Sequence, residues 1–152
     1  MNIVLFEPQI PQNTGNIART CAATNTKLTL VRPLGFSLAD RHMKRAGLDY
    51  WDRLDLTVVD EIEEILSQGS CFFFSSKAER IYSSASYPAD ALLIFGSETT
   101  GLPPILWEKY REQFYTIPMV QEQRCLNLAS SVAIVLYEAL RQNNFDPLIS
   151  QR

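Results

Sequence analysis

Residues 117–142, IPMVQEQRCLNLASSVAIVLYEALRQ, form the stretch that decides how this chain folds. The stretch continues a short apolar strand at residues 114–117, which Pro118 ends because proline cannot donate to a strand ladder. After a polar loop, Asn127 stands where the N-cap of a helix is expected. Apolar residues then recur at spacings of three and four, which predicts one buried face of a long helix. They are Leu128, Val132, Val135, Leu136, Ala139 and Leu140.

The loop before this helix carries more polar chemistry than a simple connection needs. Arg124, Asn127 and Ser130 gather donors and acceptors at a strand-to-helix junction, where α/β proteins usually bind ligands. A C-terminal core helix entered through a tight loop would explain the helix alone. The polar loop makes a binding site at its start the hypothesis to test.

Short apolar runs elsewhere in the chain alternate with helical patterns. This alternation predicts an α/β fold with an open, mostly parallel sheet and helices on both faces. Residues 1–152 are expected to form a single domain, since no linker, repeat or low-complexity segment interrupts them. The strands are expected at residues 2–6, 28–31, 56–59, 71–74, 91–95 and 114–117.

The remaining segments are assigned from their caps and breakers. A helix should start at Asn13 or Thr14, and an acidic helix capped by Asp60 should run to about residue 68. A short basic helix is expected at residues 40–46, and a proline-initiated helix should end near Tyr110. Residues 78–90, rich in serine, are expected to form surface turns.

Composition limits the class of protein. Of the residues, 46% are hydrophobic and 20% are charged, as in ordinary globular proteins. No membrane span or signal peptide is evident, and neither a disulfide framework nor a zinc site fits three scattered cysteines and His42 alone. We expect a cytoplasmic protein without a metal and without membrane attachment.

The charge is unevenly spread along the chain. The net charge is −3, which is unusual for a nucleic-acid-binding protein. Residues 1–53, however, carry seven Lys/Arg against four Asp/Glu, while the rest carries seven against thirteen. A basic N-terminal third could contact a phosphate backbone, although a solvated face of mixed charge would give the same count.

Three motifs together resemble the signatures of a known family. They are NTGNIARTC at residues 13–21, FGSETTGLP at residues 95–103, and the loop and helix ending in YEALRQ. In this order they resemble the SpoU branch of the SPOUT RNA methyltransferases. The match extends through LGF and RAGLDYWD and is closest to the small tRNA wobble-nucleotide 2'-O-methyltransferases of the TrmL type.

The resemblance implies a fold, a reaction and partners. The fold would be the SPOUT fold with a C-terminal trefoil knot, which general topology rules would not predict. The cofactor would be S-adenosyl-L-methionine, leaving S-adenosyl-L-homocysteine as product. The acceptor would be the ribose 2'-hydroxyl of cytidine or uridine at the wobble position of tRNA, and the protein would be a homodimer with shared sites.

The resemblance also implies which residues act on the acceptor. Arg19 matches the catalytic arginine of the family, although a lone helical arginine is more often simply solvated. A guanidinium is a poor base, so stabilisation of the developing alkoxide is the role we expect. Asn13, Glu98 and Asn127 match positions that orient the ribose or the arginine. Glu98 is expected to hold Arg19 through a charge-assisted bond. Arg19 is expected near the N-terminal end of its helix, among backbone N–H groups that favour anions.

The cofactor would lie among three strand-end loops. By resemblance, Phe74, Gly96, Ile117 and Leu126 would contact it through their backbones. Gly96 and Gly101 fit because a missing Cβ permits close approach, although turn glycines would look the same. The family usually has serine at the position of Cys125, so here a backbone contact is expected to remain and a hydrogen bond from the side chain is expected to be weaker.

The RNA is expected to contact a basic segment and the last helix. Arg41, Lys44 and Arg45 stand close to Tyr50 and Trp51, and such mixtures suit phosphates and unstacked bases. Aromatic side chains packed under a loop would explain the same pattern. Tyr137 could contact the acceptor or the dimer partner, or be a core tyrosine.

Other functions remain open on the sequence alone. The same chemistry could act on another tRNA position or on ribosomal RNA. A catalytically inactive RNA-binding or cofactor-sensing module is less consistent with the presence of Arg19, Glu98 and Asn127. A nucleotide-binding α/β protein is disfavoured because the glycine fingerprint of dinucleotide folds is missing.

Overall fold

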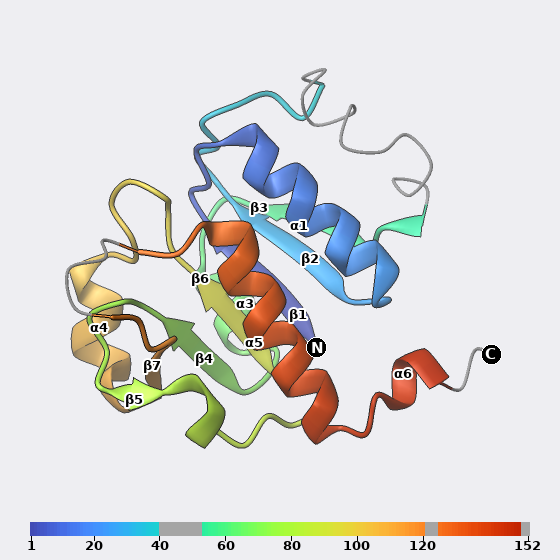
Figure 1. Ribbon diagram of the computed structural model, residues 1–152. Helices are drawn as coiled ribbons and strands as arrows, with labels where there is room; N and C mark the ends of the chain where they lie inside the picture. The colour runs from blue at the N-terminus through green and yellow to red at the C-terminus, as the bar shows by residue number, and fades with distance from the viewer. Residues whose placement is uncertain (40–52, 121–124, 150–152) are drawn as a thin grey trace.

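A computed structural model describes residues 1–39, 53–120 and 125–149, and shows an open sheet between helices (Figure 1). The sheet has seven strands in the order β3-β2-β1-β6-β4-β7-β5, and every strand pairing is parallel. This confirms the predicted α/β class. The strands are β1 (Asn2–Phe6), β2 (Lys27–Val31), β3 (Leu56–Val59), β4 (Cys71–Phe74), β5 (Arg80–Ile81), β6 (Leu92–Phe95) and β7 (Phe114–Thr116).

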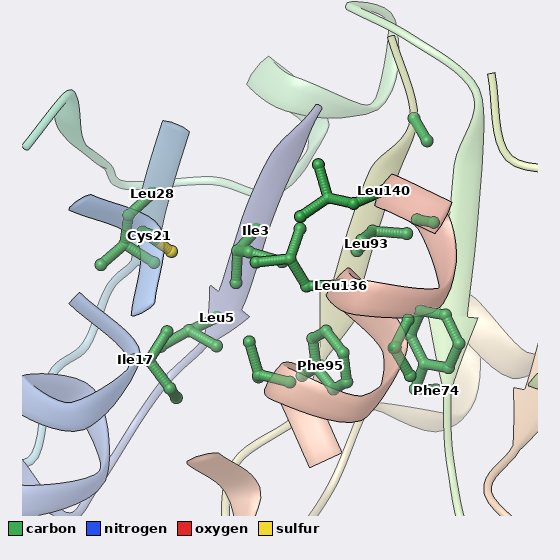
Figure 2. Close-up of a cluster of buried hydrophobic side chains, with 14 of the residues drawn as sticks. Ile3, Leu5, Ile17, Cys21, Leu28, Phe74, Leu93, Phe95, Leu136 and Leu140 are labelled. Carbon is green, nitrogen blue, oxygen red and sulfur yellow. The ribbon is translucent and has the colours of Figure 1, made fainter. Parts of the chain in front are cut away.

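Helices cover both faces of the sheet, as predicted. Helices α1 (Pro11–Ala23) and α5 (Leu128–Gln142) lie side by side on one face, and their apolar residues join one core cluster (Figures 1 and 2). Helices α3 (Glu63–Leu66) and α4 (Pro104–Tyr110) contribute to a second cluster on the opposite face. The remaining short elements are η2 (Tyr82–Ser84), η3 (Arg111–Gln113) and α6 (Asp146–Ile149).

The core explains why α5 was recognisable in the sequence. Val132, Val135, Leu136, Ala139 and Leu140 are all buried, which is the apolar face that the spacing predicted. Figure 2 shows Leu136 and Leu140 packed over the sheet beside residues of β1, β4 and β6. Removing this face from water contributes the main stabilisation of the helix, since burial of a leucine-sized side chain contributes about 1.5–3 kcal/mol.

The strand register aligns the carboxyl ends of the central strands. Phe95 of β6 pairs with Leu5 of β1 on one side and with Phe74 of β4 on the other. Phe74 pairs in turn with Tyr115 of β7. The segments that follow these strands therefore leave the sheet at one edge, where ligands of open α/β sheets bind.

Three local predictions need correction. Helix α1 begins at Pro11, earlier than predicted, because proline is well suited to the first helical position. The helix predicted from Asp60 to residue 68 is reduced to α3. Its N-cap is Ile62, and Glu64 instead accepts bonds from the backbone N–H groups of Asp60 (3.2 Å) and Glu61 (3.0 Å).

A further strand was missed, and one predicted helix cannot be assessed. Strand β5 lies within the segment predicted as turns and adds the last parallel pairing, Arg80 with Tyr115 and Ile81 with Thr116. Two residues are too short for a periodicity to be read from sequence. The basic helix predicted at residues 40–46 lies outside the described residues. None of the described helices is long and apolar enough to span a membrane.

Candidate active site

A polar network joins three segments at the carboxyl edge of β1 and β6. Its centre is the carboxylate of Glu98, in the loop after β6. That carboxylate accepts hydrogen bonds from the backbone N–H of Gln9 (2.8 Å), the backbone N–H of Ile10 (3.2 Å) and Nδ2 of Asn13 (3.1 Å). The negative charge of Glu98 also stabilises the N-terminal end of α1 through the helix dipole. The N-cap residue there, Ile10, has no side chain that could cap the helix.

Asn13 extends this network to the last helix. Its Oδ1 accepts a hydrogen bond of 2.9 Å from Nδ2 of Asn127. Oδ1 of Asn127 accepts in turn from the backbone N–H groups of Ala129 (2.9 Å) and Ser130 (3.4 Å), which confirms the predicted N-cap. One chain of bonds therefore runs from α5 through Asn13 to Glu98. The structure brings together three of the four residues predicted to be catalytic.

The glycines of the loop after β6 are required by the loop itself. A Cβ on Gly96 would collide with the backbone of Gly101 and Leu102, so the loop closes tightly on this residue. Gly101 has a φ of 72°, a left-handed conformation that glycine adopts readily, and its N–H bonds to the carbonyl of Ser97 at 2.9 Å. The tight turn aims Glu98 at the start of α1.

Arg19 does not join this network in the single chain. It follows Asn13 by six residues, so it lies about 9 Å further along α1 and about 120° around its axis. Its side chain is exposed and forms no hydrogen bond or ion pair with a described residue. Within one chain the predicted bond from Glu98 to Arg19 is not formed, and Glu98 binds Gln9, Ile10 and Asn13.

The expected position of Arg19 near the start of its helix is also wrong. Because α1 begins at Pro11, Arg19 is the ninth helical residue, beyond the unpaired N–H groups of the first turn. Arg19 lies off the apolar face of α1, since Ile17, Ala18 and Cys21 are buried and Arg19 is exposed. Its guanidinium is available to a ligand or a second chain.

The residues predicted to hold the cofactor lie along one part of the same edge. Phe74 ends β4, Gly96 follows β6, and Ile117 follows β7, all of which are neighbouring strands. Cys125 and Leu126 directly precede Asn127, and both are exposed. The ring of Phe74 stacks on Phe95 with centroids 4.8 Å apart, and this contact holds the ends of β4 and β6 together.

This edge has the chemistry that an adenosine-containing cofactor needs. The exposed Leu126 and half-buried Ile117 supply apolar surface for a flat ring system, and the loops supply backbone donors and acceptors. Glu98 and the hydroxyl residues Ser97 and Thr99 add polar groups beside it. Among the residues that the structure describes, no group of His, Cys, Asp or Glu side chains could hold a metal ion.

Two predictions about the RNA-binding residues have different outcomes. Arg41, Lys44 and Arg45 lie outside the described residues, so their role stays a prediction. Tyr137 is 48% exposed, which excludes a core tyrosine in the single chain. Its ring stands on the exposed side of α5, which leaves contact with the acceptor or with a partner chain.

Sequence reasoning missed the contacts of the N-terminal loop and of the far end of α5. The backbone N–H groups of Gln9 and Ile10 bind Glu98, and a backbone group has no signal of its own in a sequence. At the C-terminal end of α5, Gln142 bonds to the backbone of Ala85 and Tyr87. The motif YEALRQ was recognised, but the contacts of its glutamine could not be inferred.

Comparison with known proteins shows the family to which this chain belongs. Residues 1–137 match the model of the SpoU rRNA Methylase family. A tRNA (cytidine(34)-2'-O)-methyltransferase of Methylovorus glucosotrophus is 43% identical over 152 residues, covering 95% of this chain and 96% of the relative. A Listeria monocytogenes protein that carries this name provisionally is 48% identical over 156 residues, covering 99% of this chain and 92% of that protein.

Solved structures agree with the sequence comparison. A structure concerned with the 2-OH methylation of C/U34 on tRNA is 41% identical and superimposes with a TM-score of 0.88, covering 94% of this chain and 95% of that one. The SpoU methyltransferase AviRb of Streptomyces viridochromogenes, solved in complex with AdoMet, has a TM-score of 0.82 at 22% identity. It covers 95% of this chain and 58% of its own, and it supports the fold alone.

Proposed function

Since this chain belongs to the SpoU methylase family, we propose that it methylates the ribose 2'-hydroxyl of the wobble nucleotide of tRNA, cytidine or uridine. The observation that carries this proposal is the near full-length match to relatives and to a solved structure concerned with this reaction. The network of Glu98, Asn13 and Asn127 gives the chain the fixed polar groups that the reaction requires.

The proposed cofactor is S-adenosyl-L-methionine, bound at the carboxyl ends of β6, β4 and β7. It supplies an activated methyl group, so the protein has to bind, orient and manage charge. We assign the backbone contacts to Phe74, Gly96, Ile117 and Leu126, and a backbone contact to Cys125. Gly96 and Gly101 shape the loop that forms one wall of the proposed cofactor site. Glycine is therefore needed at these positions for the turn of the loop, and not for close approach of the backbone to the cofactor.

Arg19 is proposed to act where negative charge develops. As the 2'-hydroxyl attacks the methyl group it loses its proton, and a guanidinium can stabilise the resulting oxygen and the adjacent phosphate. Asn13 and Asn127 would hold the ribose, since their amides lie at the edge between the helices. Glu98 acts through Asn13, which it orients by a direct bond.

The position of Arg19 supports a site built from two chains. In one chain Arg19 faces away from Asn13, so it cannot complete the network of its own subunit without moving around α1. Helix α5, which packs beside α1, also exposes the apolar side chains of Ile134 and Tyr137. We therefore propose a homodimer in which Arg19 of one subunit serves the site of the other.

The fold-level expectations follow the family. We propose that residues 1–152 form a single SPOUT domain and that the C-terminal segment forms a trefoil knot. The bonds from Asn127 through Asn13 to Glu98 support this, because they hold the start of α5 at the loop after β6. We also propose a cytoplasmic protein, as its tRNA substrate requires.

A second RNA substrate is the main alternative. The family description refers to ribosomal RNA, whereas the two relatives described above are named for tRNA. Because the reaction at a ribose is the same, the site geometry alone does not separate the two. The experiment must therefore identify the methylated nucleotide.

The test is transfer of labelled methyl groups from S-adenosylmethionine to tRNA from a strain that lacks this modification. Nucleosides are identified by mass spectrometry, with Arg19→Ala run in parallel. We expect 2'-O-methylcytidine or 2'-O-methyluridine at the wobble position, with a loss of about 100-fold or more in the variant. Labelled ribosomal RNA beside unlabelled tRNA would overturn the tRNA assignment.

A further inference from the structure

A second concave site lies at the same edge of the sheet, beyond β1. It is a hollow of about 170 Å³ where the ends of β1, β2 and β3 meet the start of α4. Phe6 and Leu106 contribute apolar walls, while Glu7, Arg32 and Asp60 contribute polar ones. The site described above uses none of these side chains.

The hollow is directly connected to the catalytic network through the chain. Glu7 lines the hollow, and Gln9, two residues later, donates its backbone N–H to Glu98. Two residues span at most about 7 Å, so the part of the chain that lines the hollow lies within that distance of the backbone N–H that holds Glu98. Glu7 also has a φ of 47°, an unusual conformation for a residue other than glycine, which bends the chain between the two sites.

The size of the hollow limits what it can hold. Its volume equals that of about six water molecules at roughly 30 Å³ each, which is on the order of one nucleobase. A whole nucleoside with its phosphate would not fit. Ile105, at the rim, is 64% exposed and would contact the flat face of a base.

The charge of the hollow selects among the parts of a nucleotide. Four carboxylate side chains line it against one guanidinium, so a phosphate is repelled. Carboxylates instead accept hydrogen bonds from the exocyclic amino groups of bases. Arg32 bonds to Asp60 at 3.3 Å, which holds one carboxylate at the rim.

We infer that this hollow binds a nucleobase of the RNA substrate close to the methylated nucleotide, and that this base carries an exocyclic amino group. The inference rests on the proposed function, since it takes RNA as the substrate. A base held here splays the loop open and moves the neighbouring ribose toward Asn13 and Asn127. The hollow thereby adds sequence specificity to a ribose reaction that has none of its own.

The first test pairs a protein variant with altered RNAs. Ile105→Glu adds a charge at the rim, and Ile81→Glu makes the same change on β5, outside the hollow. Methyl transfer to an anticodon stem-loop is measured, and then to stem-loops made abasic at one loop position at a time. We expect Ile105→Glu to raise the KM for the intact RNA about tenfold, with little change for Ile81→Glu. With the stem-loop that lacks the bound base, Ile105→Glu and the unaltered protein should have the same KM.

A second variant keeps the inference testable if Ile105→Glu fails to fold. Asp60→Asn removes a carboxylate at an exposed position and should weaken discrimination for the amino group. On RNA whose base at that position lacks the amino group, Asp60→Asn and the unaltered protein should have the same KM. Equal losses for Ile105→Glu and Ile81→Glu on every RNA would overturn the inference.

The outcomes separate this inference from the proposed function. If the unaltered protein leaves the anticodon stem-loop unmethylated but methylates ribosomal RNA, the proposed substrate is wrong. The same pairing of variants and abasic positions is then made on that ribosomal fragment. An abasic position at which the difference in KM between Ile105→Glu and the unaltered protein disappears would support the base site. If the difference persists at every abasic position, the inference is contradicted.

Discussion

The two ends of α5 both hold distant segments through side-chain amides, but only one end lies where ligands bind. At the N-terminal end, Asn127 joins Asn13 and Glu98 at the carboxyl edge of the sheet. At the C-terminal end, Gln142 holds the segment before β6 by bonds to Ala85 (3.0 Å) and Tyr87 (2.9 Å). Similar bonds can thus serve chemistry at one end and stability at the other.

The surroundings explain this difference. The C-terminal bonds enclose Tyr87, which is 3% exposed and packs on Phe72 with ring centroids 4.8 Å apart. The N-terminal network stands beside the exposed Leu126, and although Asn13 is buried, Asn127 is exposed and Glu98 is partly exposed. A change at the C-terminal end of α5 should therefore lower the stability of the fold. A change at the N-terminal end should lower activity more than stability.

Among the changes that compare the two ends of α5, the largest effect is expected at Glu98. Glu98→Ala removes the acceptor for three N–H groups, so the loop before α1 and the Asn13 amide lose their fixed positions. We expect kcat to fall about 100-fold, as misplacement by about 1 Å can cause. Single-turnover methylation and thermal unfolding measure the two effects, with Glu98→Gln as the isosteric control. Unchanged kcat in Glu98→Ala would contradict the role of the network.

At the other end, Gln142→Ala should affect the fold. The backbone N–H and C=O of the 85–87 segment lose their partners, which costs about 2 kcal/mol of unfolding free energy. For a chain of this size the melting temperature should fall by about 4–8 °C. Activity per folded molecule should stay within about twofold. A loss of kcat without a loss of stability would reverse the comparison between the ends of α5.

Glu138 gives the C-terminal end a dependence on pH. Hydrogen bonds from Arg141 and Gln142 lower the pKa of Glu138 to about 2. The stabilisation by its charge is therefore complete above the unfolded pKa of about 4.3 and is lost as the pH falls toward 2. Glu138→Gln should be less stable than the unaltered protein at pH 7, and the difference should shrink below pH 4. Urea unfolding at several pH values measures this, and a constant difference would contradict it.

The smallest effect is expected at Cys125. Its exposed thiol should react quickly with a thiol reagent, whereas Cys21 is buried, and burial raises its pKa to about 12. Since only a backbone contact is proposed for Cys125, Cys125→Ser should change kcat and cofactor affinity by less than about threefold. Added S-adenosylmethionine should slow the reaction of Cys125. Equal reaction rates with and without cofactor would place Cys125 outside the cofactor site.

Patterns that depend on burial were readable from the sequence. The apolar face of α5 and the apolar strands gave the fold class and most strand boundaries, because buried positions follow the period of each element. The N-cap at Asn127 was readable for a local reason, since its side chain bonds two and three residues ahead. These features need no knowledge of distant contacts.

Contacts across long separations were not readable. The bond between Asn13 and Asn127 joins residues 114 positions apart, and only the resemblance to a family brought them into one site. The partners of Glu98 within one chain, Asn13 and two backbone N–H groups, were not expected either, since the resemblance indicated Arg19 alone. The distance of Arg19 from the first turn of α1 depended on where the helix begins, and Pro11 is two or three residues before the predicted start.

The most direct test of this account mixes two inactive variants. Arg19→Ala and Asn127→Ala are each purified, then unfolded together and refolded so that subunits exchange. If Arg19 serves the site of the partner, half of the dimers are mixed and each has one intact site, so wobble methylation should return to about one quarter of the unaltered level. A mixture as inactive as the two parents, with mixed dimers shown to be present, would contradict a site shared between subunits.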